Sequence, residues 1–336
     1  MKLEEIAIVK RITPIDFELR ECGLNSIEKL ASRYQADGKS EETARRMIAE
    51  KEYKSKAQKE FLNELIEHYK FSPNQIYRID EDSLKDKIKD YKAVISFGGD
   101  DTQTRVSHVI DGIPLIGLRA DNKSLGKTLY YNRENFCKAI EKIKNNEYEI
   151  EEWPRLEATV NGKQFARATA HYCLSAPFAN KHMTRFTIYK NKKLLTPEKG
   201  IPGSGILVWT GAGSTGQPRS ATWYFGEHIQ PFKPTERKAI WAVQDPYSPD
   251  KHPFEEYGLD ALFGEIKEDD ELLLVSKCKT IDHLLRSLKL DPGHMTADSL
   301  EDAFFKEGTE IKMRLSKNPL RVIYIPEISA KNKKWC

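Results

Sequence analysis

Two glycines and two aspartates follow an apolar run in the segment that begins at Ile95 and reads ISFGGDDTQTR. Gly98 and Gly99 have no Cβ atom, so their backbone N–H groups can approach a phosphate, and a helix beginning just after them would add its positive end. The carboxylate of Asp100 could act as a general base or help to hold a metal ion near the phosphates. Thr102 could cap the helix or donate a hydrogen bond to a phosphate.

The same residues also permit a purely structural explanation. A Gly-Gly-Asp turn ends many strands, and Asp100 could simply cap the helix that follows. Short glycine motifs are common in proteins that bind no phosphate. The motif by itself therefore leaves both explanations open.

A second glycine-rich loop lies in the C-terminal half, in the segment GILVWTGAGSTGQPRSA. Its apolar run ends at Trp209 or Thr210 and is followed by small and hydroxylated residues that include Gly211, Gly213, Ser214, Thr215 and Gly216. Backbone N–H groups that point inward, with two hydroxyls beside them, can surround a nucleotide. A plain connection between two strands is the alternative, and the stretch itself favours neither.

Strands alternate with helices in the first half of the chain, which predicts a parallel α/β sheet. The apolar runs that we predict to be strands are 6–12, 74–79, 92–97 and 113–118. The helical periods, the longest of which Ser40 can cap, fall at 41–69, 83–89, 103–110 and 133–144. Ligands in open α/β sheets bind at the carboxyl ends of the strands, which is where Gly98 and Gly99 lie.

Strands and turns dominate the second half, which predicts an antiparallel, β-rich domain of the sandwich type. Asn161 and Gly162 separate two apolar runs and are a strong hairpin signal. Further runs predict strands at 185–190, 205–210, 239–244, 271–276, 310–316 and 320–325. We therefore expect an N-terminal α/β nucleotide-binding domain over 1–125 and a C-terminal β-rich domain over 126–336.

Composition limits the class of protein. The 336 residues are 39% hydrophobic and 31% charged, and the formal net charge is only +3. This balance gives no broad electrostatic reason to expect a nucleic-acid partner. The five cysteines form no CxxC pair, and the N-terminal segment has neither the long apolar run of a secretory signal nor the acid-poor composition of an organellar presequence. No apolar run reaches the length of a membrane span. A cytoplasmic protein without a membrane partner is the prediction.

Together the two loops resemble a known family. The residues from Gly98 to Thr102 are similar to the GGDGT signature that NAD kinases share with diacylglycerol and sphingosine kinases. The segment IPLIGLRADNKSLG, which contains Asp121 and Ser124, resembles the NAD-kinase segment that usually reads G-x-NTD. The segment TGAGSTG resembles the family's TGTGSTA-type loop, which the lipid kinases do not share. The long insertion before the GGD turn is most similar to the mitochondrial-type branch of the NAD kinases.

The resemblance implies a reaction and a fold. NAD kinases transfer the γ-phosphoryl group of ATP, with Mg²⁺ or another divalent metal, to the 2′-hydroxyl of the adenosine ribose of NAD. Asp100 is then the expected catalytic carboxylate, and Asp101, Thr102, Asp121 and Ser124 are expected to contact nucleotide. The implied fold is a Rossmann-like N-terminal domain and a β-rich C-terminal domain with the active site between them. Family members are usually homodimers or higher homo-oligomers.

Several positions depart from the family pattern. Asp101 replaces a glycine of the signature and adds a negative charge beside the phosphates. Arg119-Ala120-Asp121 replaces Asn-Thr-Asp. Leu174 and Ser175 fall where the family has an Asn-Glu pair that holds the ribose and nicotinamide side. An NAD kinase with an altered substrate site is therefore predicted. The alternatives are a kinase of the same fold acting on another small hydroxylated substrate, and a non-catalytic nucleotide-binding relative.

Overall fold

The computed structural model describes residues 1–122, 126–176, 183–279 and 291–329. These residues form two compact units. Unit 1 comprises Met1–Ile150 and the described residues from Val322 onward, and unit 2 comprises Glu151–Arg321. The division falls later in the chain than the boundary we predict after residue 125. The reason is that α6 (Phe136–Lys144) buries its apolar side in unit 1 before the chain leaves it.

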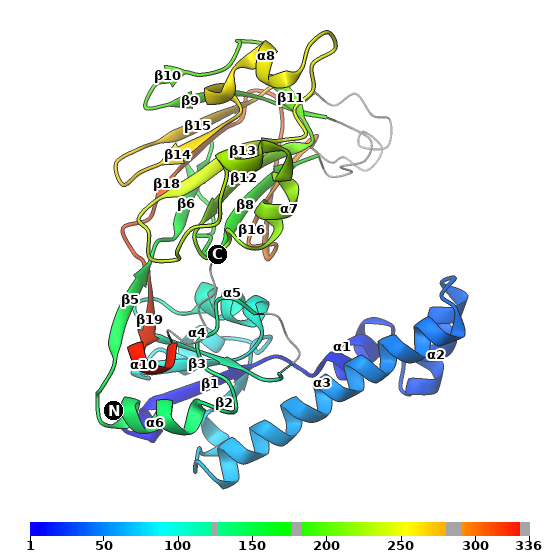
Figure 1. Ribbon diagram of the computed structural model, residues 1–336, viewed down its shortest axis with the longest axis vertical. Coiled ribbons are helices and arrows are strands. Elements are labelled where there is room, and N and C mark those ends of the chain that lie inside the picture. Colours follow the sequence, from blue (N-terminus) through cyan, green and yellow to red (C-terminus); the bar gives the residue numbers. More distant parts are fainter. Residues whose placement is uncertain (123–125, 177–182, 280–290, 330–336) are drawn as a thin grey trace. The chain divides into compact units, whose positions relative to one another are not determined.

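A six-stranded sheet forms the centre of unit 1 (Figure 1). Its neighbouring strands are, in order, β2 (Ile76–Arg78), β1 (Ile6–Lys10), β3 (Ala93–Gly98), β4 (Leu115–Arg119), β19 (Leu320–Tyr324) and β5 (Glu149–Trp153). The pairs β2–β1, β1–β3, β3–β4 and β4–β19 are parallel, as the alternation of strands and helices predicts. β19 was expected in the β-rich half, but its residue Val322 lies opposite Leu115 of β4. A tertiary contact between distant segments therefore completes this sheet.

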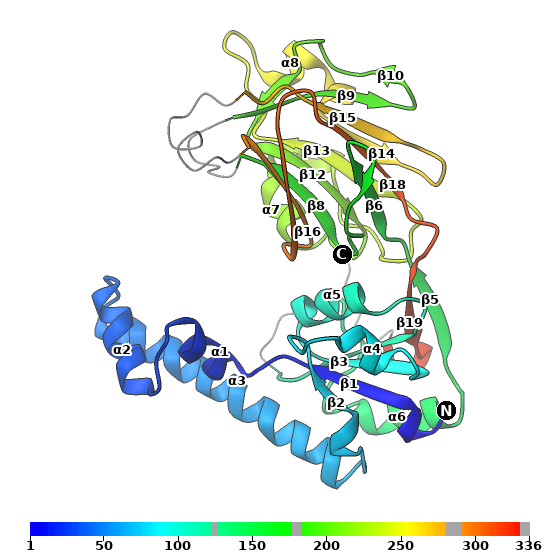
Figure 2. The same cartoon turned by 180° about the vertical axis from the view of Figure 1, so that it is seen from behind.

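Long and short helices cover or extend from this sheet. They are α1 (Pro14–Glu21), α2 (Ile27–Ala36), α3 (Glu41–Glu67), α4 (Leu84–Ile88), α5 (Asp100–Val109), α6 and α10 (Pro326–Ser329), with 3₁₀ turns η1 (Leu3–Glu5) and η2 (Pro73–Gln75). The predicted cap of the longest helix is confirmed, because the Ser40 hydroxyl accepts a hydrogen bond from the backbone N–H of Thr43 at 3.2 Å. α1 and α2 lie beside the first half of α3, away from the sheet (Figures 1 and 2). We call α1, α2 and α3 together the helical arm.

The helical arm has a small apolar core of its own. Its buried members come from all three segments and are Ile15, Leu30, Tyr34, Ala44 and Ile48. At one edge of this core, the Tyr34 hydroxyl donates to Glu18 at 2.8 Å, and Lys51 pairs with the same carboxylate at 2.9 Å. α1 and α3 are therefore held at a fixed spacing beside the first strand of the sheet.

Unit 2 contains two antiparallel sheets. The first has β10 (Lys193–Leu194), β9 (Thr184–Lys190), β15 (Leu272–Ser276), β18 (Glu310–Leu315), β6 (Leu156–Val160) and β7 (Lys163–Gln164) in order, with β11 (Ile201–Gly203) paired to β9. The second has β14 (Phe263–Ile266), β13 (Ala239–Gln244), β12 (Gly205–Thr210), β8 (His171–Ser175), β16 (Gly293–Ala297) and β17 (Glu301–Phe305). Short helical segments complete the unit: α7 (Gln217–Ala221), η3 (Trp223–His228), α8 (Pro253–Tyr257) and η4 (Leu259–Ala261).

Side chains of both sheets form one hydrophobic core, so the β-rich sandwich is confirmed. The predicted hairpin is present as well, since Asn161 and Gly162 both have positive φ, 48° and 77°. β8 shows the alternation of a strand that is buried on one face only. Tyr172 and Leu174 point into the core, whereas the neighbouring residues His171, Cys173 and Ser175 are half-buried on the opposite face.

A buried carboxylate fixes the start of β8. Asp298, which follows β16 and has a φ of 53°, accepts hydrogen bonds from the backbone N–H groups of Thr169 (2.7 Å), Ala170 (2.9 Å) and His171 (2.7 Å). Its side chain is only 6% exposed. Three donors converging on one carboxylate offset the cost of burying its charge and set the register of the second sheet.

We expect Asp298→Ala to lower the free energy of unfolding by roughly 3 kcal/mol or more, because three buried donors lose their acceptor. Denaturant unfolding measures this loss. Asp302→Ala is the matched control, since the Asp302 side chain is 61% exposed and pairs with His294 on the surface. Equal stability of the two variants would show that the Asp298 contacts contribute little.

No helix in the described ranges is long and apolar enough to cross a membrane.

Candidate functional site

The glycine turn at the end of β3 places its two glycines in different surroundings. A Cβ atom added to Gly98 would lie 2.6 Å from the Cβ of Thr102, so the first turn of α5 excludes any side chain there. A Cβ on Gly99 would meet no atom within 4 Å. Gly99 has an extended backbone (φ −108°), which any residue can adopt. Gly98 is therefore required by packing, whereas Gly99 presents bare backbone to open space.

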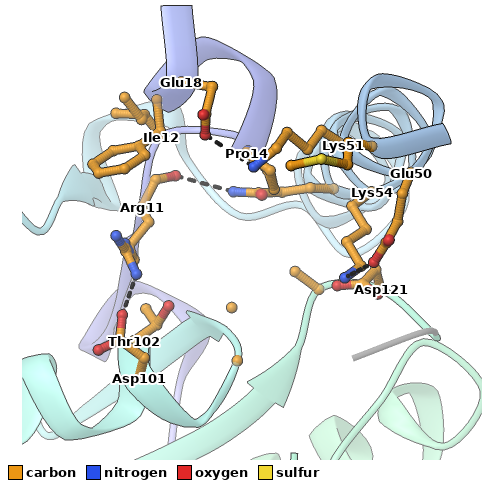
Figure 3. A pocket seen from close by; sticks show the side chains of 16 residues that line it. Arg11, Ile12, Pro14, Glu18, Glu50, Lys51, Lys54, Asp101, Thr102 and Asp121 are labelled. Carbon is orange, nitrogen blue, oxygen red and sulfur yellow. Dashed lines mark hydrogen bonds and ion pairs between the residues drawn. The ribbon is translucent and has the colours of Figure 1, made fainter. Parts of the chain in front are cut away.

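That open space is a cavity of about 480 Å³, which we call the arm cavity (Figure 3). The turn, the first turn of α5 and the end of β4 form one wall, and the helical arm forms the other. Residues on the turn side include Gly98, Gly99, Asp101, Thr102 and Asp121, and those on the arm side include Glu18, Glu50, Lys51, Lys54 and Gln58. The volume is within the range of small-molecule sites.

Charged side chains line the arm cavity in pairs. Arg11, just after β1, pairs with Asp101, which also accepts a hydrogen bond from Arg105 at 3.3 Å. On the arm, Lys54 lies 2.7 Å from the Glu50 carboxylate (Figure 3). Among the described residues, the wall carries three basic side chains (Arg11, Lys51, Lys54) and four acidic ones (Glu18, Glu50, Asp101, Asp121). A polyphosphate would therefore enter more easily together with its own cation.

Asp100 does not line this cavity. One of its carboxylate oxygens accepts from the backbone N–H of Lys127 at 2.8 Å, and the other from the N–H (3.0 Å) and hydroxyl (2.5 Å) of Thr128. The loop approaches so closely that a Cβ on Gly126 would lie 2.9 Å from this carboxylate. The helix cap itself is Gly99, without a side-chain hydrogen bond. Asp100 thus anchors the loop after β4 and does not cap α5, and its catalytic role stays a prediction.

The structure brings most of the other predicted residues of unit 1 to the cavity. Asp101, Thr102 and Asp121 all contribute to the wall, and Thr102 is 3% exposed. The backbone N–H of Ala120 donates to the Gly98 carbonyl at 3.1 Å, which brings the residue after it, Asp121, close to the turn. Ser124 lies outside the described residues.

The glycine-rich loop of unit 2 is tightly packed. A Cβ on Gly211 would lie 2.8 Å from the Cα of Pro234, and one on Gly213 would lie 2.8 Å from the carbonyl carbon of Ala170. The Ser214 hydroxyl donates to the Gly211 carbonyl at 2.8 Å and accepts from the Phe232 N–H at 3.3 Å.

Part of the backbone of this loop is also hydrogen-bonded within the loop. The N–H groups of Gly213, Ser214 and Gly216 donate to the carbonyls of Thr210, Gly211 and Gly213, respectively. Packing therefore explains why glycine stands at 211 and 213. Thr215 is half-buried, and nucleotide binding by this loop stays a prediction.

The two positions that replace the Asn-Glu pair differ in what they can reach. Leu174 is fully buried in the core of unit 2, so its side chain cannot contact a substrate. Ser175 lies on the half-buried opposite face, on the same side of β8 as His171 and Cys173. Of these two residues, only Ser175 can therefore contact a substrate through its side chain.

A polar patch borders the glycine-rich loop on that face. Burial lowers the pKa of His171, an effect that the nearby Asp298 carboxylate and a contact with Gln217 oppose. Burial also raises the pKa of the Cys173 thiol to about 11, so it is a thiol at neutral pH. The Nε2 atom of His171 is buried and has no hydrogen-bond partner in the described part of the chain.

The motifs of the sequence did not point to the arm side of the cavity. Arg11 could have been found, because it directly follows β1 and the carboxyl ends of parallel strands collect ligands. Lys54 and Gln58 could not have been found in this way, because no residue pattern distinguishes their helical turns from the other charged turns of the same helix. Gln58 is 7% exposed and donates to the Arg11 carbonyl at 3.0 Å, so α3 is tied to the end of β1.

No family model matches the chain. It is 32% identical to the NAD kinase of Sulfurisphaera tokodaii over 133 residues, which are 40% of this chain and 49% of that protein. A probable NADH kinase of Oryza sativa subsp. japonica is 24% identical over 216 residues, 59% of this chain and 63% of that protein. Over these segments the chain is similar in sequence to NAD kinases. The match spans about half the length of the first curated relatives.

Solved structures of NAD(H) kinases share the fold. A yeast NADH kinase in complex with NADH has a TM-score of 0.57 at 14% identity, over 78% of this chain and 71% of that one. An NAD kinase from Archaeoglobus fulgidus in complex with ATP has a TM-score of 0.58 at 15% identity, over 81% of this chain and 91% of that one. The predicted two-part architecture is therefore confirmed at the level of the fold.

Because Leu174 is buried, replacing it with the asparagine of the family's Asn-Glu pair would cost stability. We expect Leu174→Asn to lower the free energy of unfolding by about 3 kcal/mol or more, because an apolar side chain is lost and an amide is buried. Ser175→Asn, on the half-buried face, should change it by less than about 1 kcal/mol. Chemical denaturation measures both, and a stable Leu174→Asn variant would contradict the assigned direction of the β8 side chains.

Proposed function

We propose that this relative of the NAD kinases transfers the γ-phosphoryl group of ATP to the 2′-hydroxyl of the adenosine ribose of NAD or NADH. The observation that carries the proposal is the strand–Gly–Gly–helix turn at the wall of the arm cavity, in a chain with these relatives. In the reaction the 2′-oxygen forms a bond to the γ-phosphorus, the bond from that phosphorus to the β–γ bridging oxygen breaks, and the 2′-hydroxyl proton passes to a base.

The arm cavity would hold the phosphates. Gly99 leaves the backbone at the start of α5 uncovered, and α5 directs the positive end of its dipole there. Arg11 can exchange its exposed partner Asp101 for a phosphate, because an ion pair between partly exposed groups is weak. The arm would bring Lys54 to the opposite side. The proposed nucleotide thus contacts two segments that are far apart in the sequence.

A divalent metal fits this site as a companion of the nucleotide. The described part of the chain contains no group of three or more acidic, His or Cys side chains that could hold a metal by itself. Mg²⁺ in phosphoryl-transfer sites is usually held by one or two carboxylates plus substrate phosphates. Asp101 and Asp121, both in the cavity wall, would supply these carboxylates. When bound, the ion would neutralise charge on the transferring phosphoryl group.

The acceptor is tested directly. The purified chain is incubated with ATP, Mg²⁺ and either NAD, NADH or a panel of nucleosides, and phosphorylated products are separated by chromatography. We expect NADP⁺ or NADPH. Phosphorylation of a nucleoside alone would favour the second candidate, a kinase of another hydroxylated substrate, which the burial of Leu174 and the lack of a carboxylate at Ser175 support. Homo-oligomeric assembly and cytoplasmic location stay predictions.

Alanine variants of the two glycines of the turn test its role in nucleotide binding, with one glycine as the control for the other. We expect Gly99→Ala to keep the melting temperature of the free protein but to weaken ATP binding roughly tenfold, because its methyl group would enter the space that a phosphate needs. Gly98→Ala should instead cost about 2 kcal/mol of stability through overlap with Thr102. Calorimetric titration with an ATP analogue and thermal melts measure the two effects. Unchanged affinity in a folded Gly99→Ala variant would remove the turn from the binding site.

Asparagine variants of the two aspartates of the turn distinguish a catalytic role from the anchoring of the loop after β4. If Asp100 takes the proton, Asp100→Asn should reduce turnover by roughly a hundredfold to ten-thousandfold. It should also lower the melting temperature, since an amide cannot accept all the hydrogen bonds from Lys127 and Thr128. Asp101→Asn should melt like the parent because Asp101 is half exposed. Loss of turnover in Asp101→Asn, with near-normal turnover in Asp100→Asn, would show that Asp101 and not Asp100 is the base.

A further inference from the structure

A second cavity in unit 1 lies at the carboxyl ends of β1 and β2. Its volume is about 350 Å³, and we call it the basic pocket. It shares Ile12 and Gln58 with the arm cavity but includes no residue of the glycine turn. Carboxyl ends of parallel strands are the usual place for ligands in such sheets. The proposed function leaves this pocket without a role.

Basic side chains dominate its wall. In the part of the chain that the structure describes, four of them, Lys10, Arg20, Lys59 and Arg78, line the pocket together with one acidic residue, Asp16. Asp16 is already engaged, because it accepts from the Thr13 hydroxyl at 2.5 Å and pairs with Lys59 at 3.2 Å. The wall therefore has an excess of positive charge.

A neighbouring carboxylate orients the two arginines. Arg78 donates to both oxygens of Asp80, at 2.9 Å and 2.6 Å, and Arg20 donates to one of the same oxygens at 2.8 Å. These contacts hold the pKa of Asp80 well below its usual range, mainly through Arg78, so the carboxylate stays charged. Asp80 thus draws both guanidinium groups to the pocket, through ion pairs that are partly exposed and that a phosphate can replace.

Lys10 has no such partner. It is the last residue of β1 and lies opposite Arg78, the last residue of β2, in the parallel register, so two cations are direct neighbours. No carboxylate of the described chain lies within ion-pair distance of its ammonium group. Burial, and then the charge of Arg78, lower the pKa of Lys10, which is half-buried, and the more distant carboxylates of Asp16, Asp80 and Glu81 oppose this effect. A half-buried, unpaired cation beside another cation is unfavourable unless an anion completes the arrangement.

We propose that the basic pocket binds a small phosphate-bearing anion, such as pyrophosphate or a short phosphate ester, at a site separate from the arm cavity. Guanidinium groups match the geometry of phosphate oxygens, so Arg20 and Arg78 can exchange Asp80 for a phosphate, and Lys10 supplies a point charge. The volume is at the lower end of small-molecule sites, which suits a phosphate group with a small substituent better than a dinucleotide. The same chemistry could come from the phosphate chain of a nucleotide in the arm cavity, so the test separates the two sources.

The test titrates inorganic pyrophosphate into the full chain by calorimetry, first without nucleotide. The informative variant is Lys10→Met, which removes the unpaired charge and keeps the length of the side chain. We expect it to weaken pyrophosphate binding at least tenfold and to melt no lower than the parent. The control is Lys87→Met, which removes a lysine of α4 that pairs with Glu81 at 2.9 Å outside the pocket. The control should bind pyrophosphate like the parent.

The same titration is repeated with the arm cavity saturated by a non-hydrolysable ATP analogue. Pyrophosphate that still binds, and still depends on Lys10, establishes a separate site. Loss of pyrophosphate binding under saturation would assign the pocket to the nucleotide's own phosphates and overturn the proposal. Equal binding by the parent and Lys10→Met, or no binding by the parent, would also overturn it. Either result leaves kinase activity to be judged by its own assay.

Discussion

The contact between Gly98 and Thr102 is the constraint on which the unit 1 site depends. Since a Cβ at Gly98 would overlap Thr102, the chain can turn this sharply from β3 into α5 only with glycine there. The sharp turn places the next three residues in three directions. Gly99 faces open space, Asp100 faces the loop after β4, and Asp101 faces Arg11. One steric contact thus separates a binding surface, an anchor and an ion pair.

In unit 2, hydrogen bonds to a buried carboxylate position the glycine-rich loop. Asp298 gathers three consecutive backbone N–H groups at the start of β8, and the carbonyl of one of them, Ala170, packs against Gly213. In the glycine-rich loop, the Ser214 hydroxyl and the N–H groups of Gly213, Ser214 and Gly216 donate to carbonyls of residues 210–213. A loop that is preorganised in this way loses little entropy when it contacts a ligand, but the donors already in use are not free for that ligand.

The two cavities of unit 1 differ in charge although they share a wall. Each of the three basic side chains named in the wall of the arm cavity pairs with an acidic one, whereas Lys10 in the basic pocket has no ion-pair partner among the described residues. Gln58 stands between them and donates to the Arg11 carbonyl, which keeps α3 against the end of β1. A ligand with its own cation suits the first cavity, and a bare anion suits the second.

The sequence by itself determined the local elements and the turn chemistry. The alternation of strands and helices, the Ser40 cap and the Asn161-Gly162 hairpin depend on neighbouring residues only, and the structure confirms them. The glycine turn was placed at the correct strand end for the same reason. Only the tertiary structure decided that Asp100 anchors a loop, that Leu174 is buried and that β19 returns to the parallel sheet. It also decided that the helical arm supplies the second wall of the cavity. These features depend on which distant segments meet, and local residue patterns carry little information about such long-range packing.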